Sequence, residues 1–319
     1  MTVMNMDRVP FAMRRFVETL KNGSRHRFRV SSRALVFHAV NLLGVLVRLL
    51  GRAQARRVAY LLGDFMHRVV GIRRELVYRN LGITFPEKSP HEIRRIARGV
   101  YRNVAATLLE VLRFPLIKNA NDVAALVDLD PSVYLRGTRN GQTGAVMVSA
   151  HYGNWELMAM AFGLMVHPIT IIVKRLHNAL IDQKMNGFRT MRGNSIVYDE
   201  QALREGLRLL DSGGILAILG DQSDSNESNF GEFLGRRATM FHGAAFFALK
   251  ARVPLFVGMC RSTGDGRHKI DIREIDTSDL TFNKQDIATL ASRYTRVLEE
   301  YILRWPEEWF WLHDRWKRC

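Results

Sequence analysis

The residues best suited to chemistry are His151-Tyr-Gly-Asn-Trp-Glu156, in which a glutamate follows a histidine by five positions. On a continuous helix five residues turn two side chains about 140° apart, so the pair needs a turn between its members. Gly153 permits that turn, Asn154 is a suitable helix cap, and Glu156 then falls in the first helical turn. We therefore predict that Glu156 hydrogen-bonds one nitrogen of His151 and leaves the other free as a general base.

The predicted pair is a base and its orienting carboxylate, with no serine nucleophile in the motif. Such a pair suits activation of a hydroxyl that belongs to the substrate. The alternative for His151 and Glu156 is a capped polar pair without chemistry. The sequence contains no G-x-S-x-G, H-E-x-x-H, G-x-x-x-x-G-K or G-x-G-x-x-G motif.

Cysteine usage also limits the chemistry. Only Cys260 and Cys319 are present, too few for a disulfide framework or a multi-cysteine zinc site. Cys260 ends a predicted strand without an adjacent His or Asp, and we expect a buried structural thiol. We expect neither a metal ion nor a bound organic cofactor.

Strands alternate with helices from residue 144 onward. Apolar runs predict strands at 144–150, 168–173, 195–197, 213–220, 254–259 and 269–275. Helices are expected from about Trp155, at 199–212 with Asp199 as cap, at 238–250, and from Lys284 towards Trp305, with a long polar loop at 221–237. This order predicts an α/β fold with a mixed, mainly parallel sheet flanked by helices. Chemistry gathers at the carboxyl ends of such strands, where His151 and Asp221 both fall.

The positive charge is concentrated at the N-terminus. Residues 1–120 hold 23 basic and 7 acidic residues, a net charge of +16, whereas residues 121–319 hold 24 of each and sum to zero. A segment so basic requires an anionic partner. The basic residues alternate with Leu, Val and Phe, and no zinc-finger, RNA-binding or basic-zipper pattern is present. This favours anionic membrane lipids over nucleic acid.

The N-terminal segment is also apolar. Residues 34–47 carry no formal charge, but as a helix they rise about 21 Å, less than a hydrocarbon core of ~30 Å. We predict a helix in the membrane interface, with a soluble core helix or a tilted span between Arg33 and Arg48 as alternatives. Between Arg52 and Arg79, an apolar stripe beside arginines is typical of a membrane-surface anchor; its members are Leu61, Leu62, Phe65, Val69 and Val70.

A further helix is predicted after residue 89. Ser89 and Glu92 have the capping-box spacing, and Pro90 suits the first helical position. We expect residues 1–115 to form a basic helical membrane-associating segment and residues 116–319 an α/β body, in one continuous fold.

Six sequence blocks occur together in order: RRELVYRNLGITFPE (73–87), SAHYGNWE (149–156), VKRLHNALID (173–182), GDQ (220–222), FLGRRATMFHGAAFFALKARVPLFVG (233–258) and YTRVLEEYILRWPEEWFWLHDRWK (294–317). With these blocks, the chain resembles the lipid A late acyltransferase (lauroyl/myristoyl transferase) family. That family shares an H-x-x-x-x-D/E motif with glycerolipid acyltransferases. The resemblance spans roughly residues 35–317.

The resemblance implies transfer of a fatty acyl group from acyl carrier protein, or from coenzyme A, to a lipid-borne hydroxyl without an acyl-enzyme. It places the protein on the cytoplasmic face of the bacterial inner membrane, peripheral or singly anchored. His151 would be the general base and Glu156 its partner. Substrate contacts would come from Lys174, Arg175, Asp221 and Arg236. A solvated pair is the alternative for the first two, and loop capping or a surface ion pair for the others.

One position departs from the family pattern. A basic residue expected near the end of the third strand reads here as Tyr198-Asp199, which leaves the identity of the lipid acceptor open. A lysophospholipid acyltransferase would share the chemistry. A non-catalytic lipid-binding membrane protein is the alternative from another class, and the intact His151 and Glu156 argue against it.

Overall fold

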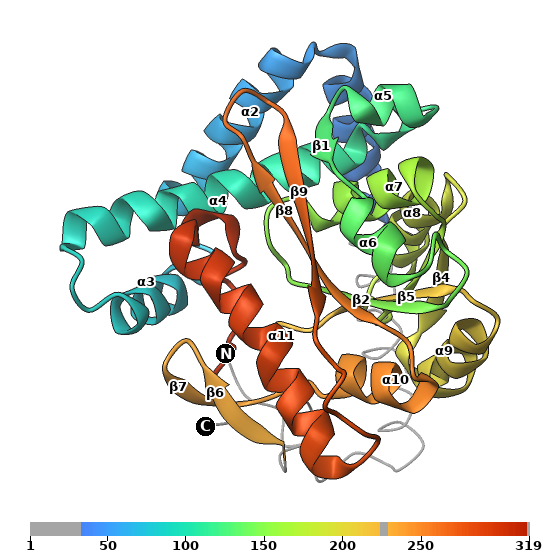
Figure 1. The fold of residues 1–319 in the computed structure, drawn as a ribbon. Helices are drawn as coiled ribbons and strands as arrows, with labels where there is room; N and C mark the ends of the chain where they lie inside the picture. The colour runs from blue at the N-terminus through green and yellow to red at the C-terminus, as the bar shows by residue number, and fades with distance from the viewer. Residues whose placement is uncertain (1–32, 224–228, 318–319) are drawn as a thin grey trace, which may run out of the picture.

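The computed structural model describes residues 33–223 and 229–317, and its centre is a seven-stranded sheet (Figure 1). The strands are β1 (Val127–Leu129), β2 (Ala145–Ser149), β3 (Ile169–Val173), β4 (Ser195–Tyr198), β5 (Ile215–Leu219), β8 (Leu255–Ser262) and β9 (His268–Ile275). Their spatial order is β1-β9-β8-β2-β5-β3-β4. Every neighbouring pair is parallel except β8 and β9. The predicted mixed, mainly parallel sheet is therefore confirmed, and β1 is an addition to it.

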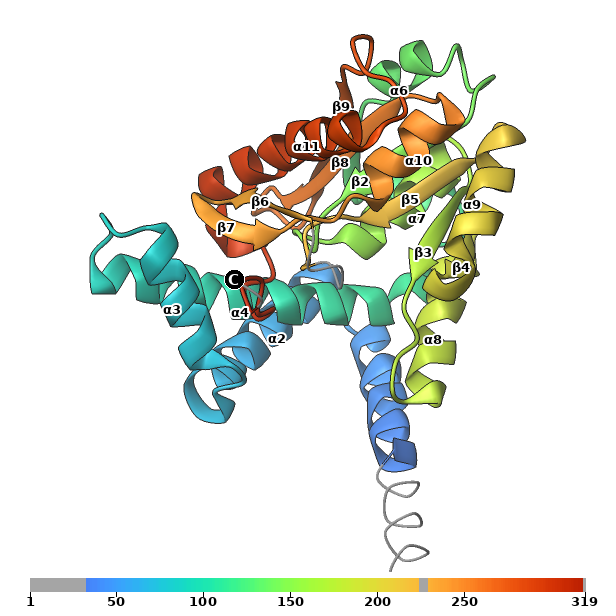
Figure 2. The same cartoon turned by 90° about the horizontal axis from the view of Figure 1, so that it is seen from below.

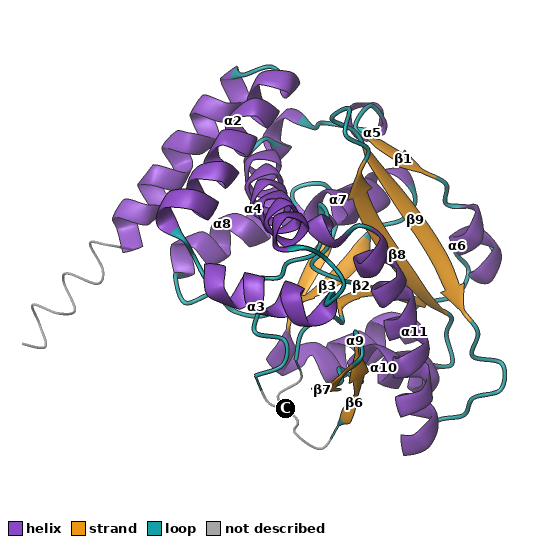
Figure 3. Ribbon diagram, turned by 90° about the vertical axis from the view of Figure 1, so that its left-hand side faces the viewer, coloured by secondary structure: helices purple, strands orange, loops and turns teal. Residues whose placement is uncertain are grey.

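Helices cover both faces of the sheet (Figures 1 and 3). The helices of the body are α5 (Ala120–Ala124), α6 (Ser132–Gly137), α7 (Trp155–Met165), α8 (Ala179–Thr190), α9 (Ala202–Asp211), α10 (Gly243–Ala251) and α11 (Lys284–Arg304). Alternate residues of β2 serve two cores: Val146 and Val148 pack in one with α10 and α11, and Ala145 and Met147 in the other with α7. All five residues of β2 are buried, as expected of a central strand covered on both sides.

The N-terminal layer begins with a helix over residues 33–49 that projects from the body (Figure 2). It continues through α2 (Arg52–Phe65), the π-helical turn η2 (Met66–Val70), α3 (Arg74–Thr84) and α4 (Pro90–Leu112). The predicted cap of α4 is confirmed, because Ser89 Oγ accepts a hydrogen bond from the Glu92 N–H and Glu92 accepts one from the Ser89 N–H. Buried residues of α4 belong to both cores, so this helix bridges the two faces of the sheet.

Many large apolar residues of α2 and of the helix over residues 33–49 point outward. On α2 the buried residues are small, namely Ala55, Ala59 and Gly63, while Leu61 is 70% and Phe65 53% exposed. On the helix over residues 33–49, the exposed apolar residues include Leu35, Leu42, Leu46 and Leu49. No helix in the described ranges, 33–223 and 229–317, is long and apolar enough to cross a membrane.

Two predicted boundaries are wrong. The expected loop 221–237 contains β6 (Phe230–Phe233) and the start of β7 (Arg236–Thr239), which pair as an antiparallel hairpin. The two turn residues, Leu234 and Gly235, both have positive φ, the conformation that two-residue hairpins favour. Because β7 runs to Thr239, the helix expected at 238–250 begins only at Gly243.

The helix expected at 199–212 also starts later, at Ala202. Asp199 lies in a preceding 3-10 turn, η4 (Asp199–Gln201), and its backbone carbonyl accepts the Ala202 N–H. The cap residue of α9 is Gln201, without a side-chain cap bond. Asp199 is therefore not the cap that the sequence predicted.

Candidate active site

His151 and Asp221 meet at the carboxyl end of the sheet. Strands β2 and β5 are parallel with Ser149 opposite Leu219, so the residues two positions further along each chain become neighbours. His151 Nδ1 lies 2.9 Å from Asp221 Oδ1, and the His151 backbone N–H donates to Asp221 Oδ2 at 3.1 Å. The prediction that both residues lie at this edge is confirmed.

Asp221 is a fully partnered, buried carboxylate. Its second oxygen also accepts the indole N–H of Trp309 at 2.8 Å, and its side chain is only 2% exposed. Burial raises the pKa of such a carboxyl, but the His151 charge and the hydrogen bonds from His151 and Trp309 outweigh this and hold the pKa of Asp221 below its ordinary value. An ionised carboxylate only accepts hydrogen bonds. The proton of neutral His151 is therefore on Nδ1, and Nε2 is free as a base.

Glu156 does not occupy the predicted position. It lies in the first turn of α7, as expected, with Asn154 capping the helix through the Leu157 N–H. However, the Glu156 carboxylate accepts from Arg189 of α8, at 3.0 Å from Nε and 2.6 Å from Nη2. The predicted hydrogen bond from Glu156 to His151 is wrong, and Asp221 takes that place.

The physical reason is the buried guanidinium of Arg189. Burial lowers the pKa of Arg189, but its hydrogen bonds and attraction to Glu156 outweigh this and raise it above its ordinary value. Both side chains are largely buried, at 19% and 7% exposed, and a charge at such a site needs a hydrogen-bonded counter-charge. Glu156 supplies it and so links α7 to α8.

The turn between His151 and α7 is held from outside. Gly153 has φ of 55°, and a Cβ there would overlap the carbonyl oxygen of Cys260. The Gly153 N–H donates to the Glu308 carbonyl at 2.8 Å, and the Gly153 carbonyl accepts from Thr107 Oγ1 at 3.0 Å. Asn154 Nδ2 donates to Glu110 Oε2 at 2.6 Å. Thr107 and Glu110 belong to α4, so the N-terminal layer helps to fix the turn that follows His151.

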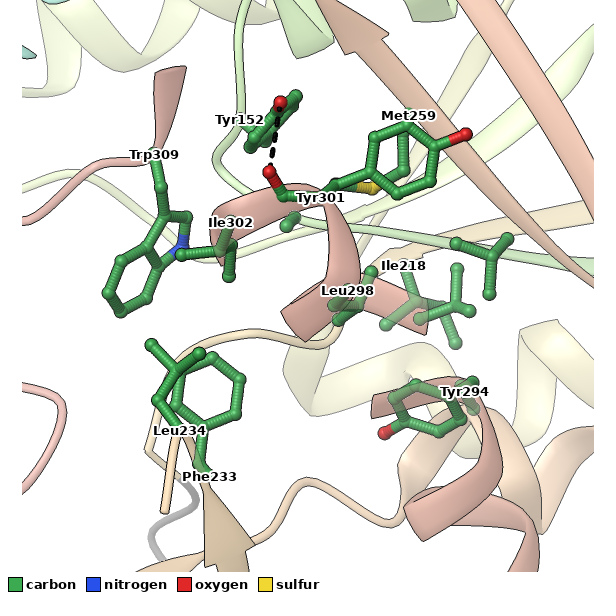
Figure 4. Packing of buried hydrophobic residues seen from close by; sticks show 14 of the residues in the cluster. Tyr152, Ile218, Phe233, Leu234, Met259, Tyr294, Leu298, Tyr301, Ile302 and Trp309 are labelled. Carbon is green, nitrogen blue, oxygen red and sulfur yellow. Dashed lines mark hydrogen bonds between the residues drawn. The ribbon is translucent and has the colours of Figure 1, made fainter. Parts of the chain in front are cut away.

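Aromatic rings surround His151. The rings of Trp155 and Phe310 lie 5.1 and 6.2 Å from the imidazole, centroid to centroid. Gln222 Nε2 lies 3.4 Å from His151 Nε2, and the His151 side chain is 23% exposed. Figure 4 shows how Trp309 packs among Phe233, Leu234 and Ile302. Sequence reasoning matched the block that contains Trp309 and Phe310 but gave neither residue a role.

A second histidine lies near the site and is neutral. His313 Nε2 is 3.4 Å from Ser223 Oγ. Burial is the main cause that lowers the pKa of His313 to about 4. His313 therefore adds no positive charge near His151 at neutral pH. In the sequence His313 is followed by Asp314 and Arg315 and lies between tryptophans, but this run matches no motif whose spacing would have pointed to the site.

Lys174 and Arg175 follow β3, which pairs in parallel with β5, so they lie at the same edge of the sheet. Lys174 is exposed. The Arg175 guanidinium lies 3.7 Å from the centre of the Tyr198 ring and pairs with Glu200 at 3.7 Å. Tyr198, the departure from the family pattern, therefore supports an arginine. A substrate contact by Lys174 or Arg175 stays a prediction.

Arg236 begins β7, and its guanidinium lies 4.0 Å from the centre of the Trp316 ring. The ring of Trp316 in turn contacts the ring of Trp309, and Trp309 donates a hydrogen bond to Asp221. A substrate contact by Arg236 stays a prediction. Cys260 is buried as expected. Within residues 33–223 and 229–317, no group of three His, Cys, Asp or Glu side chains could hold a metal ion.

Comparisons with known proteins show the family of this chain. The family model described as bacterial lipid A biosynthesis acyltransferase matches residues 21–318. The chain is 25% identical to the lipid A biosynthesis lauroyltransferase of Escherichia coli K12, over 80% of this chain and 83% of that protein. It is 24% identical to the phosphatidylinositol mannoside acyltransferase of Mycolicibacterium smegmatis, over 72% of this chain and 74% of that protein. With a match over nearly its whole length, the chain belongs to the bacterial lipid A biosynthesis acyltransferase family and is an acyltransferase.

Proposed function

We propose that this acyltransferase moves a fatty acyl group from a thioester donor directly to a hydroxyl of a lipid A precursor or a related glycolipid. The observation that carries the proposal is the 2.9 Å contact between His151 Nδ1 and the buried Asp221. In the neutral imidazole this contact puts the proton on Nδ1, so Nε2 is the nitrogen that can accept a proton as a general base.

In the proposed step, His151 Nε2 removes the proton of the acceptor hydroxyl while its oxygen attacks the thioester carbonyl. The tetrahedral intermediate then expels the thiolate, which takes the proton back from the imidazolium. Asp221 stabilises that imidazolium without itself becoming protonated. At the acyl carbon the C–S bond breaks and the C–O ester bond forms, while the proton passes from the acceptor oxygen through His151 to the thiolate sulfur, so no acyl-enzyme is required.

Glu156 and Arg189 act one step further out in this proposal. Their ion pair fixes the start of α7, and Asn154 at the same helix end is held by Glu110 of α4. These contacts keep the His151 turn rigid. Glu156 is thus a positioning residue rather than the direct partner of the base.

Two relatives point to the acceptor class. One is named for lipid A biosynthesis and the other for phosphatidylinositol mannoside, so both act on lipids that carry sugars. We infer a lipid-linked sugar hydroxyl as acceptor, with a lysophospholipid hydroxyl as the alternative. Lys174 and Arg175 supply cations for acceptor phosphate at the edge of the sheet.

The donor and the location follow from the charge. An acyl carrier protein is acidic and fits the +16 N-terminal segment, with acyl-coenzyme A as the alternative donor. Outward apolar residues on α2 and on the helix over residues 33–49 support peripheral association with an anionic membrane. We place the protein on the cytoplasmic face of the bacterial inner membrane, where carrier protein and lipid precursor meet.

The test is acyl transfer by the purified full chain, with acyl carrier protein and coenzyme A thioesters as donors. Acceptors are a lipid A precursor and a lysophospholipid, with product masses measured for each pair. We expect His151→Asn to lower turnover by about 10²–10⁴-fold with an unchanged thermal unfolding curve. Near-normal turnover in a folded His151→Asn protein, or an acyl group covalently retained on the enzyme, would contradict the mechanism. Transfer to the lysophospholipid alone would contradict the acceptor class.

A further inference from the structure

A cavity of about 480 Å³ lies apart from His151, between the N-terminal layer and the sheet. Its walls come from the start of α2, the end of α4, the turn η3 (Phe114–Leu116), α5 and the loop joining β8 to β9. Neither His151 nor Asp221 lines it. Figure 1 shows these elements gathered at one end of the molecule, where α2, α5 and the tip of the β8–β9 hairpin lie.

Four arginines line this cavity: Arg52, Arg56, Arg113 and Arg267. Their guanidinium groups donate to backbone carbonyls; Arg56 donates to Gly264 at 2.7 Å and Arg113 to Leu50 at 2.7 Å. Arg52 and Arg267 donate to carbonyls at 3.3 Å. Within the part of the chain that the structure describes, none of the four forms an ion pair with a carboxylate. Four guanidinium groups therefore line one cavity, beside the carboxylates of Glu110, Asp122 and Asp265.

The carboxylates of the cavity already have other partners. Glu110 accepts from Asn154 at 2.6 Å and lies 3.0 Å from His268 Nε2. Asp122 accepts the Lys118 N–H, and Asp265 accepts the Arg267 N–H. These carboxylates fix the helix caps and turns around the cavity, which leaves the arginine side chains available to a ligand.

The floor of the cavity is apolar. Ala55, Ala59, Leu109, Phe114 and Leu157 line it and are buried. A guanidinium rim above an apolar floor matches a molecule with an anionic head and a hydrocarbon body. Arginine pairs especially well with phosphate, because its planar fork donates two parallel hydrogen bonds.

The cavity also begins where the apolar N-terminal helix ends. Arg113 donates to the carbonyls of Val47 and Leu50, at the end of the helix over residues 33–49. Leu46 and Leu49, 52% and 78% exposed, lie within six residues of Arg52. If the helix over residues 33–49 enters the membrane interface with these leucines, the arginines that follow it lie at the depth of the lipid phosphates.

We propose that this cavity binds a phosphate-bearing acylated lipid, with the phosphate at Arg52, Arg56 and Arg267 and hydrocarbon against Leu109 and Leu157. Two sources share this chemistry, a bilayer phospholipid and the phosphorylated lipid acceptor. The site is separate from His151, so binding there does not depend on the proposed acyl transfer.

The test is lipid titration of the full chain in neutral detergent, with bound lipid counted by native mass spectrometry. The four probes are phosphatidylglycerol, diacylglycerol without phosphate, a phosphorylated lipid A precursor and inorganic phosphate. We expect a saturable site for phosphatidylglycerol, for the precursor, or for both, and at least tenfold weaker binding of diacylglycerol. Preference for phosphatidylglycerol identifies a bilayer lipid, and preference for the precursor identifies the acceptor. Equal binding of diacylglycerol, or binding of inorganic phosphate as tight as that of the lipids, would overturn the proposal.

Three variants locate the site. Arg52→Gln combined with Arg56→Gln should weaken lipid binding roughly 10–30-fold. Ala106→Phe, which fills the cavity from α4 with all charges kept, should weaken it too. The matched control is Arg204→Gln with Arg208→Gln on α9, which removes the same charge from an exposed surface outside the cavity. An equal loss in the control would assign the binding to net charge and overturn the site. His151→Asn should bind lipid normally. A wild-type chain that binds lipid here but transfers no acyl group would count against the proposed function and not against this cavity.

Discussion

The edge of the sheet at His151 and the N-terminal helical layer differ in how their polar and apolar side chains are buried and hydrogen-bonded. At the edge, Asp221 is buried and each of its oxygens accepts a hydrogen bond. In the N-terminal layer, Leu61 and Phe65 are exposed, and within residues 33–223 and 229–317 the arginines of the cavity donate to backbone carbonyls and form no ion pair. The polar groups of the first region are hydrogen-bonded by other residues of the chain. The second region exposes apolar side chains, and its cavity arginines form no ion pairs with the described residues.

In the proposed function, the edge of the sheet at His151 carries out the reaction and the N-terminal layer binds the membrane. A base must be held in one tautomer and one orientation, and a buried, fully partnered carboxylate does that at little cost in reorganisation. Binding to a lipid surface instead requires groups that are not yet satisfied by the protein itself. Helix α4 joins the two regions, because Thr107 and Glu110 contact the turn after His151 and Arg113, directly after the helix, lines the cavity.

Asp221→Asn should produce the largest effect. The amide cannot stabilise the imidazolium, so we expect turnover to fall by about 10³–10⁴-fold. Turnover is measured with saturating acceptor, and unfolding in urea checks the fold. Glu156→Gln is the matched comparison and should lose less. A greater loss in Glu156→Gln, at equal stability, would restore Glu156 as the direct partner of His151.

Glu156→Ala should have the next largest effect, this time on stability. It leaves the buried Arg189 guanidinium without its counter-charge, which costs about 3–5 kcal/mol of unfolding free energy. Glu156→Leu combined with Arg189→Met should recover most of that loss, because removing both charges leaves neither unpaired. Chemical denaturation measures both proteins. A stable but inactive double variant would show that the pair does more than position α7.

The exposed stripe of α2 should matter for membranes and not for folding. Leu61→Asn with Phe65→Asn should weaken binding to anionic vesicles by about 1.5–3 kcal/mol, while the unfolding temperature stays within a few degrees. Co-sedimentation with vesicles measures the binding. Replacement of buried Ala59 by Asn is the control and should destabilise the fold instead. Unchanged vesicle binding in the stripe variant would mean that this surface contacts another protein.

The pH dependence of stability tests Glu308, whose backbone carbonyl accepts a hydrogen bond from the turn after His151. Burial, helped by the charge of Glu307, raises the pKa of Glu308 to about 7. The folded state therefore holds a proton that the unfolded chain releases near pH 4.5, and stability falls as pH rises from about 4.5 to 7. The loss should be on the order of 2–3 kcal/mol. Glu308→Gln should flatten this profile in denaturation at pH 5 and pH 8. An identical profile in the variant would assign the titration to another group.

Thr107→Val should give the smallest effect. It removes the hydrogen bond to the Gly153 carbonyl at nearly constant volume and should cost about 1–2 kcal/mol of stability. A several-fold drop in kcat with little change in KM is expected, because the His151 turn loosens. Thr107→Ser keeps the hydroxyl and should restore kcat. Failure of Thr107→Ser to restore it would point to packing of the methyl group.

Local sequence patterns predicted most of the fold. The strand runs, the Ser89 cap and α11 follow from periodicity and capping chemistry, which act over a few residues. Placement of His151 and Asp221 at one edge also followed, since each directly succeeds a buried strand. The β6–β7 hairpin was missed because its strands are four residues long and its turn contains a non-glycine residue with positive φ.

The amino-acid sequence by itself determined the kind of chemistry available: a histidine after a buried strand, a glycine turn, and a basic, apolar N-terminus. Only the tertiary structure decided which carboxylate holds His151. Glu156 is five positions away in the chain and Asp221 seventy, yet parallel pairing of β2 with β5 brings Asp221 into contact. Glu156 instead forms an ion pair with the buried guanidinium of Arg189, which is also distant in the sequence. Spacing along the chain limits which residues can meet locally, but strand register and the pairing of buried charges select the partners that do.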